Sequence, residues 1–541
     1  MKLSPDNLPN DVDLLKQLLL ETLAAKDNAI VLKDAEIAAL KHSVQRLLEQ
    51  FRLAQQQRFG ASSESHDYQG ELFNEAEVTV DEPVELTADA NASVPPKQRA
   101  KRKLLPKVLP REVIIHDISD EDKQCDCCGH QLALMGQDSS EKLKFIPAQI
   151  SVIEHVRLKY SCKHCETQGT KANIKQAAVP ASPIPKSVAT PSLLSQLITS
   201  KYQYALPLYR QETLFKQHGI ELNRKTMADW MMKSAALFKL LYDLLHQHLL
   251  TQAVLHADET TLKVINDERV KSYMWVYCSG ADGPSIEPRY QGLRSIVLYD
   301  YQDGSRAGTC VSRFLATKQT VFNGYLQVDG YAAYQQASNK LVGCWAHARR
   351  KFKEALVAQG KAKAGKVSKA DMGLSMIAKL YRIETQIQSL SLEERLYFRR
   401  THSRAQLALF KQWLDKSSLQ VSKQSPLGKA ILYSLNQWSK LSRYTEDSRL
   451  NIDNNRAERA VKPFVIGRKN WLLNHNHSGA EASAMLYSII ETAKANGLIP
   501  FDYIEHCLAL LSYPNCDLNS LLPWQVVLDK ALFAGRLQMI C

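Results

Sequence analysis

Three acidic residues lie at positions where a charged side chain is unfavourable for folding but suited to binding a metal ion. Asp258 lies in the apolar, strand-like segment QAVLHADETTLKVI, Asp329 ends the apolar strand LQVDGY, and Glu458 lies early in a predicted helix that opens with NIDNNRAERA. A buried carboxylate costs free energy unless it is paired, and coordination of a hard cation such as Mg²⁺ can pair it. Two strand-end aspartates and a helical glutamate can hold two divalent ions about 3.5–4 Å apart, an arrangement suited to phosphodiester chemistry. Taken alone, Asp258 fits a solvent-facing strand end better, but three such acids favour the catalytic interpretation.

The elements around these acids predict how they would meet. Strands are predicted at 252–264, 270–279, 294–301, 324–329 and 341–345, with a helix near 308–317. This order is that of a ribonuclease-H-like α/β domain, in which the first and fourth strands lie side by side. Asp258 and Asp329 would then be neighbours. A helical, basic segment interrupts the plan before the helix that carries Glu458.

The composition indicates a multidomain α+β protein with a polyanionic partner. The chain has 541 residues, too many for one core, and a formal net charge of +13, which favours nucleic acid over membrane. No apolar run of membrane-spanning length and no signal-peptide pattern is present, so we expect a cytoplasmic, nucleoid-associated protein. In that compartment the 11 cysteines would be thiols or metal ligands and not disulfides.

The chain divides into eight predicted segments. They are a coiled-coil helix at 10–57, a linker with a basic run at 58–110, a zinc-binding module at 111–180, a helical, helix-turn-helix-like DNA-binding region at 190–250, the first part of the catalytic domain at 251–358, a helical insertion at 359–449, the second part of the catalytic domain at 450–500 and a helical tail at 501–541.

A seven-residue repeat of apolar side chains predicts the N-terminal coiled coil. The repeat comprises Leu23, Ile30, Ile37, Val44 and Phe51. Lys26 and Lys33 occupy seam positions and weaken its first half. The alternative is a helical hairpin packed on its own protein; we expect self-association into a homo-oligomer.

Two Cys-x-x-Cys pairs predict a structural Zn²⁺ site. The ligands would be Cys125, Cys128, Cys162 and Cys165, because four thiolates in two such pairs suit tetrahedral zinc. The pairs are separated by apolar, strand-like sequence with room for a β-hairpin, as in a zinc ribbon. Cys127 or His130 could replace one ligand, but the outer spacing fits better.

Several basic residues are candidates for DNA contact. They are Lys101, Arg102 and Lys103 in the linker, Arg224 and Lys225 at the start of the last helix of the helix-turn-helix-like region, His347, Arg349 and Arg350 after the last strand, and Arg468 and Lys469 beside Trp471. Each group has a plainer alternative: a solvated tether, ordinary helix packing, a packed strand–helix junction, and a core tryptophan. His256, Glu259 and Asp453 lie near the three acids in sequence, and we predict only a supporting or surface position for them.

Taken together, these motifs resemble bacterial DDE transposases of the insertion-sequence-66 type over nearly the whole chain. The marks are RFGASSE after the N-terminal helix, the two cysteine pairs, HADET, VDGYAAY, CWAHARRKF, DNNRAERAVKPFVIGRKNWL and SGAEASAMLYSIIETAKANGL. The resemblance implies a ribonuclease-H-like catalytic domain split by a helical insertion, with Asp258, Asp329 and Glu458 as the metal-binding triad. It also implies that N-terminal modules recognise the element ends and that two small accessory proteins of the same element take part.

The activity expected from this resemblance is two-metal-ion transesterification. Two Mg²⁺ ions, with Mn²⁺ as a substitute, would activate water to cut double-stranded DNA at the element ends, and the freed 3′-hydroxyls would attack target DNA. Two rival classes remain: a metal-dependent nuclease of the same fold without strand transfer, and a non-catalytic DNA-binding regulator. The intact triad argues against the regulator, and the coil and zinc module argue against a simple junction nuclease.

Overall fold

The computed structural model describes residues 11–59, 150–160, 175–318, 320–338, 340–359 and 367–528. The chain forms two compact units, one of Met1–Val84 with Ala181–Val526 and one of Glu85–Pro180 with Val527–Cys541. In the second unit, β1 (Lys159–Tyr160) pairs with β2 (Lys175–Gln176) as an antiparallel ribbon. The predicted zinc ligands Cys125, Cys128, Cys162 and Cys165, and the basic residues Lys101, Arg102 and Lys103, lie outside the described residues.

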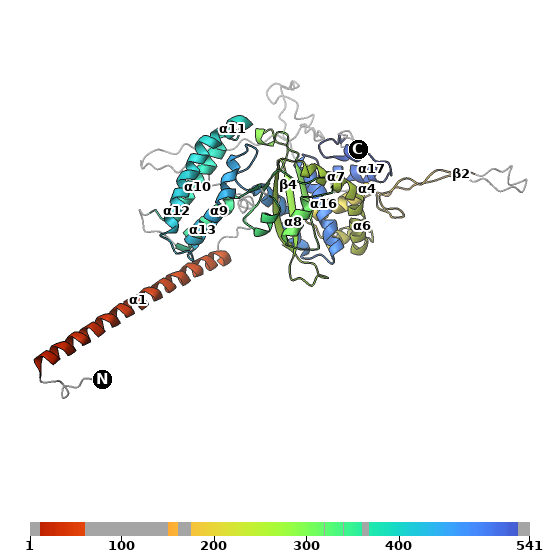
Figure 1. Ribbon diagram of the computed structural model, residues 1–541. Helices are drawn as coiled ribbons and strands as arrows, with labels where there is room; N and C mark the ends of the chain where they lie inside the picture. Colours follow the sequence, from red (N-terminus) through yellow and green to blue (C-terminus); the bar gives the residue numbers. More distant parts are fainter. Residues whose placement is uncertain are drawn as a thin grey trace, which may run out of the picture. The chain divides into compact units, whose positions relative to one another are not determined.

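Helix α1 (Val12–Phe59) is one continuous helix, drawn in red in Figure 1. Its predicted seam residues, among them Leu23, Ile30 and Phe51, are exposed along it. The helix is therefore present as the heptad pattern predicts, while its pairing into a coiled coil stays a prediction. Among the described residues, no helix has both the length and the apolar character needed to cross a bilayer.

Four helices precede the sheet: α4 (Pro191–Tyr202), α5 (Leu208–Gln217), α6 (Arg224–Leu237) and α7 (Lys239–Leu250). Local sequence sets their ends. The side chain of Thr190 caps α4 and that of Asn223 caps α6. Gly219, with φ of +74°, makes the turn between α5 and α6 because a left-handed conformation costs glycine little. The predicted succession of helix, glycine turn and helix is confirmed.

A mixed five-stranded sheet follows, with strand order β5-β4-β3-β6-β7. Its strands are β3 (Val254–Leu262), β4 (Ser272–Ser279), β5 (Ile296–Asp300), β6 (Tyr325–Gln327) and β7 (Leu341–Val342). Strand β4 is antiparallel to both of its neighbours, β3 and β5, while β6 runs parallel to β3 and to β7. The side-by-side placement of the first and fourth strands, predicted from their order, is confirmed.

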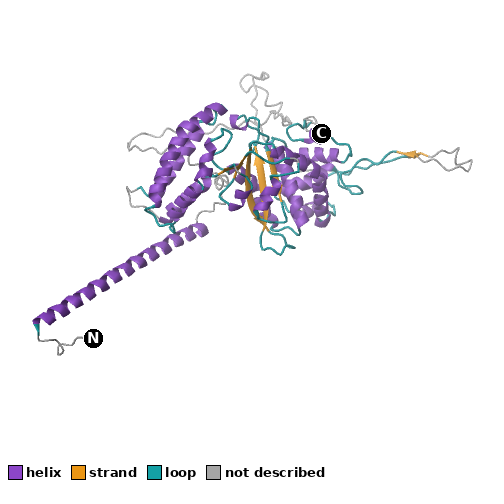
Figure 2. Ribbon diagram, in the orientation of Figure 1, coloured by secondary structure: helices purple, strands orange, loops and turns teal. Residues whose placement is uncertain are grey.

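Helices cover both faces of this sheet (Figure 2). On one face α15 (Asn455–Trp471) packs on β3 and β4, and α16 (His477–Ala495) packs on β5. On the other face Phe314 of α8 (Gly308–Phe314) stacks on Tyr277 of β4, with ring centroids 3.7 Å apart. This part also contains helix α17 (Pro500–Leu511) and the 3₁₀ turns η3 (Pro288–Tyr290), η4 (Ala332–Gln336) and η7 (Leu518–Leu521). The 3₁₀ turn η6 (Arg443–Thr445) lies between β7 and α15.

Between β7 and α15 the chain forms a helical subdomain. Its elements are α9 (Trp345–Gln359), α10 (Lys369–Gln386), α11 (Leu392–Phe398), the π-helical turn η5 (Arg399–Ser403), α12 (Arg404–Ser418), α13 (Pro426–Asn436) and α14 (Trp438–Ser442). Buried Trp345, Phe352 and Phe410 belong to its core, so α9 packs with the insertion although it follows β7 directly.

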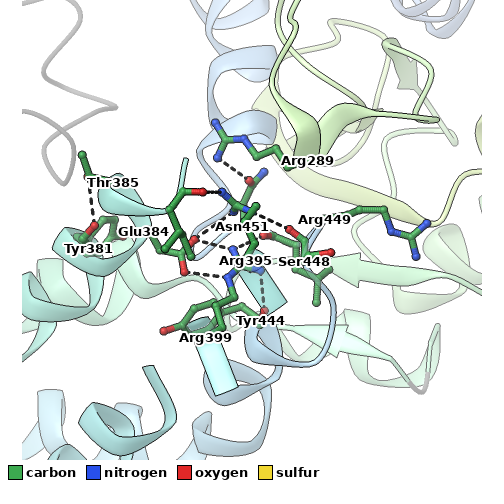
Figure 3. A network of polar contacts seen from close by, with 12 residues as sticks. Arg289, Tyr381, Glu384, Thr385, Arg395, Arg399, Tyr444, Ser448, Arg449 and Asn451 are labelled. Carbon is green, nitrogen blue, oxygen red and sulfur yellow. Dashed lines mark hydrogen bonds and ion pairs between the residues drawn. The ribbon is translucent and has the colours of Figure 1, made fainter. Parts of the chain in front are cut away.

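Two fully buried arginines fasten the end of this insertion (Figure 3). The Arg399 guanidinium donates hydrogen bonds to Glu384, at 2.6 and 2.9 Å, and to the carbonyl oxygens of Tyr444, Asp447 and Leu450. Arg395 donates to the carbonyl oxygens of Ser448 and Ile387 and to Glu384. Because buried charges are tolerated only when their hydrogen bonds are satisfied, the carbonyls of residues 444–450 are held in place. That segment leads directly to the helix with Glu458.

Candidate active site

The sheet brings the two predicted aspartates to the same edge. In the parallel pair of β3 and β6, His256 lies opposite Gln327. Asp258 lies two residues further along β3, and Asp329 lies two residues beyond Gln327, the last residue of β6. Because the two strands are parallel, both residues lie toward the same end of the pair. Both are half-buried.

Helix α15 brings the third acid to that edge. Glu458 lies in its first turn and is 5% exposed. Helix α15 packs on β3, the strand of Asp258, and its first turn is tied to that strand by a hydrogen bond from the Asn454 side chain to the carbonyl oxygen of Ala257, at 2.9 Å. Asp258, Asp329 and Glu458 thus come from three elements that pack together, and their joint binding of metal stays a prediction.

The charges of neighbouring acids contribute to raised pKa values of Asp258 and Glu458. Burial, followed by the charges of Glu259, Asp329 and Glu458, holds the pKa of Asp258 well above its usual range. Burial raises the pKa of Glu458 to about 6, with Asp329 adding to the rise and Arg350 opposing it. Like charges held together in a partly dry site are unstable alone, and a cation between them removes that cost.

One oxygen of Glu458 has no hydrogen-bond partner among the described residues although it is buried. Nδ1 of His347 is 3.6 Å from this Oε1, and a guanidinium nitrogen of Arg350 is 3.8 Å from the other oxygen. Burial and the charge of Arg350 lower the pKa of His347 to about 4, so its ring is neutral at pH 7. A buried carboxylate oxygen without a hydrogen-bond partner is a donor that fits a hard divalent cation.

Cys344 joins the helix of His347 to the helix of Glu458. Its buried Sγ accepts the backbone N–H of Asn454 at 3.2 Å, just before α15. Cys344 itself immediately precedes α9, and the N–H of His347 also acts on the thiol. The potential ligand atoms of Cys344, His347 and Glu458 lie within 4.8 Å of one another. Among the described residues this is the one such group found, and neither Asp258 nor Asp329 belongs to it.

A buried polar network beneath the acids was not foreseen from the sequence. Nδ1 of His256 is 3.0 Å from Oδ1 of Asn454, and Nε2 of His256 is 3.4 Å from the amide nitrogen of Asn451. The Gln327 amide donates to the carbonyl oxygens of Asn451 and Asp453, at 2.7 and 2.8 Å. The network therefore links the strand of Asp258, the strand of Asp329 and the approach to Glu458. The available signal was polar side chains at His256 and Gln327, two residues before each aspartate in otherwise apolar strands.

The partners of His256 fix its tautomer. The Asn454 amide nitrogen donates to Ala257, so its Oδ1 is an acceptor and Nδ1 of His256 must carry the proton. Nε2 is then the acceptor for Asn451, whose own Oδ1 accepts from Arg289 at 3.1 Å. Burial lowers the pKa of His256 to about 3, which keeps the ring neutral. Each ring nitrogen of His256 therefore has one hydrogen-bonding role: Nδ1 donates and Nε2 accepts.

Glu259 faces away from Asp258 and braces the turn after Asp329. Its carboxylate accepts from the Tyr334 hydroxyl at 2.7 Å and pairs with Arg306 at 2.6 Å. Arg306 in turn lies 3.9 Å from the ring centroid of Tyr331, whose backbone N–H donates to Asp329 at 2.8 Å. With a side chain 4% exposed, Glu259 is a supporting residue and not a surface one.

The other predicted DNA contacts are dispersed. Arg224, Lys225, Arg350 and Lys469 are exposed, and Arg349 is half-buried. Arg468 is half-buried and donates to Thr260 and Thr261 beyond Asp258 on β3. Trp471 is half-buried and packs edge-on against Tyr202, with ring centroids 6.0 Å apart.

Comparisons with known proteins agree with this layout. Four family descriptions match successive parts of the chain: "Transposase IS66 family" at 186–482, "zinc-finger binding domain of transposase IS66" at 122–166, "Transposase C of IS166 homeodomain" at 46–114 and "IS66 C-terminal element" at 488–524. The zinc-finger match spans Cys125, Cys128, Cys162 and Cys165, which supports structural zinc in this module.

Similar proteins are known from Sinorhizobium fredii (strain NBRC 101917 / NGR234). The proteins y4qI and y4jD, both described as uncharacterized, are each 31% identical to this chain; the matches cover 97% and 98% of this chain and 98% and 99% of theirs. The first family match alone spans more than half of the chain and contains all three acids. The chain belongs to the IS66 family of transposases.

Proposed function

We propose that this transposase cuts DNA at the ends of its element and joins the freed 3′-hydroxyls to target DNA, with Asp258, Asp329 and Glu458 as the catalytic metal-binding residues. The proposal is supported by the elements that carry these acids packing together, with the charges of Asp329 and Glu458 raising the pKa of Asp258. A buried oxygen of Glu458 that has no hydrogen bond among the described residues supports it further. The carboxylate donors suit two Mg²⁺ ions, for which Mn²⁺ substitutes.

A ribonuclease-H-like assignment of the catalytic domain supports this proposal. The strand order β5-β4-β3-β6-β7, with three antiparallel strands followed by two parallel ones, supports this assignment. A helical subdomain then separates β7 from α15. The fold alone does not specify chemistry, so the proposal rests on the side chains at the edge of the sheet.

The chemistry of the site follows from its residues. When bound, a pair of divalent ions activates water or a 3′-hydroxyl and stabilises the leaving oxygen. The three carboxylates would hold these ions beside the reacting phosphate. The exposed Arg350 beside Glu458 can contact a phosphate oxygen. Water attack breaks one phosphodiester bond and frees a 3′-hydroxyl; attack of that hydroxyl on the target replaces one phosphodiester with another. No covalent enzyme intermediate is required.

The remaining modules are assigned to DNA and to assembly. A Cys125, Cys128, Cys162 and Cys165 zinc site and the exposed residues Arg224 and Lys225 of α6 would contact element ends, together with the basic linker. The exposed apolar seam of α1 would pair with a second copy of the chain, which gives a homo-oligomer able to hold two ends. Accessory proteins of the same element would complete the complex.

A strand-transfer assay with Mg²⁺ and labelled element ends tests this proposal. We expect the unmodified protein to give joined product, and Asp258→Asn to bind the ends without cutting or joining them. Asp415→Asn, which changes an exposed aspartate on α12, is the matched control and should keep full activity. Cleavage without joining would favour a nuclease, binding alone a regulator, and cleavage by Asp258→Asn would remove Asp258 from the site.

A further inference from the structure

An imidazole nitrogen and a carboxylate oxygen face each other beside the proposed triad without forming a hydrogen bond. Nδ1 of His347, in the first turn of α9, is 3.6 Å from Oε1 of Glu458, in the first turn of α15. That separation is too long for a hydrogen bond. Both atoms are buried, and neither has a hydrogen-bond partner among the described residues. Orphaned buried polar atoms are rare in folded proteins, and a pair of them pointing at one another calls for a ligand.

The separation suits two ligands of one ion. Bonds of about 2.0–2.2 Å from an imidazole nitrogen and a carboxylate oxygen to one metal leave the two donor atoms roughly 3–3.5 Å apart. Other partners for the pair are already engaged. Arg350 lies beside Oε2 of Glu458, and the Cys344 sulfur accepts the N–H of Asn454. His347 is therefore available to a ligand in a way that Cys344 is not.

We propose that Nδ1 of His347 binds the same divalent ion as Oε1 of Glu458, so that this ion has one nitrogen donor besides carboxylate oxygens. The inference rests on the proposed function and adds a fourth protein ligand to its three acids. It also changes the expected role of His347, from a contact to DNA to a contact to metal. The Cys344 sulfur stays a brace between the two helices and not a ligand.

A nitrogen donor alters which ion the site prefers. Mg²⁺ takes oxygen ligands almost exclusively, whereas Mn²⁺ is bound by imidazole as well. The site should therefore bind Mn²⁺ more tightly than Mg²⁺, and the preference should depend on His347. Removing one ligand is expected to weaken Mn²⁺ binding by at least about tenfold, with a smaller effect on Mg²⁺.

Pulsed electron paramagnetic resonance of Mn²⁺ tests the inference without relying on activity. The untagged full-length protein, in excess over Mn²⁺, should show coupling between Mn²⁺ and a histidine ¹⁴N nucleus. That coupling should vanish in His347→Gln and in His347→Asn, while weaker Mn²⁺ binding through the carboxylates remains. His402→Gln, an exposed histidine in η5, is the matched control and should keep the coupling.

The outcomes separate this inference from the proposal on which it rests. Bound Mn²⁺ that depends on Asp258 but shows no ¹⁴N coupling, or coupling that survives in both His347 variants, would overturn the role of His347 and leave the triad intact. Absence of any Mn²⁺ binding that depends on Asp258 or Glu458 would overturn the metal site itself, and His347 with it. Coupling lost only in the His347 variants supports the inference.

Discussion

Nδ1 of His256 lies 3.0 Å from Oδ1 of Asn454, and this contact joins the strand of Asp258 to the start of the helix of Glu458. His256 is two residues before Asp258, and Asn454 is four residues before Glu458. Gln327, two residues before Asp329, donates to the backbone that precedes Asn454. Each of the three acids is thus preceded, a few residues earlier in the chain, by one member of a single buried network.

Asn454→Ala should disable catalysis without preventing DNA binding. It removes the acceptor of His256 and the donor to Ala257, so Asp258 and Glu458 lose their shared support. Residues that orient metal ligands typically contribute about 10–100-fold, and we expect a loss of that size in strand transfer. End binding, measured by gel shift, should be unchanged. Full activity in Asn454→Ala would show that the network does not position the acids.

Glu458→Gln should stabilise the metal-free protein. The pKa of Glu458 is about 6 when folded and near its ordinary 4.5 when unfolded, so the folded state holds the proton more tightly. The resulting destabilisation is absent below pH 4.5 and complete above pH 6, where it amounts to about 2 kcal/mol. Thermal unfolding at pH 8 without divalent ions should therefore give a higher Tm for Glu458→Gln.

Divalent ions should reverse that order. Mn²⁺ stabilises a state that binds it, so it should raise the Tm of the unmodified protein and leave Glu458→Gln nearly unchanged. Glu393→Gln, at an exposed glutamate of α11, should behave like the unmodified protein in both buffers. Without metal, a lower Tm for Glu458→Gln than for the unmodified protein would contradict a destabilising effect of ionised Glu458.

Arg399→Lys should loosen the insertion. Lysine cannot reproduce the planar set of donors that serves Glu384 and three carbonyl oxygens, and Glu384 would lose its strongest partner. Breaking a buried ion pair in this way costs about 3–5 kcal/mol. Arg400→Lys, at the exposed neighbouring position, is the control and should leave the Tm unchanged. Equal Tm values for the two variants would show that the buried network does not hold the return to α15.

Cys125→Ser should lower the zinc content measured by atomic emission, while Cys127→Ser should not. Both residues lie in the zinc-finger match, but only Cys125 completes the two Cys-x-x-Cys pairs. Loss of zinc from Cys127→Ser and its retention by Cys125→Ser would assign the ligand set differently. The rest of the chain has its own core and should keep its secondary structure in either variant.

Much of the frame could be predicted because its signals are local. Carboxylates in or after apolar strands made Asp258 and Asp329 candidates, and alternating apolar residues predicted the strands themselves. The strand order then placed β3 beside β6. Caps and turns, such as Asn223 and Gly219, located the ends of α5 and α6.

What escaped prediction depends on contacts between distant residues. His256 and Asn454 are 198 residues apart, and nothing near either one names the other. Arg399 resembles its exposed neighbour Arg400 in sequence, and only the fold buries it. Glu259 seemed a supporting or surface group, and its brace to Tyr334 required the turn after Asp329 to be in place.

Iron-mediated cleavage of the protein chain tests most directly whether Asp258, Asp329 and Glu458 share metal ions. Fe²⁺ bound in place of Mg²⁺ generates hydroxyl radicals with ascorbate and peroxide, and these cut the backbone next to the ion. We predict cuts close to Asp258, Asp329 and Glu458 in the same molecule, all suppressed by excess Mg²⁺ and all lost in Asp258→Asn. Cuts near one acid only, or cuts that persist unchanged in Asp258→Asn, would contradict the convergence of the three acids on shared metal ions.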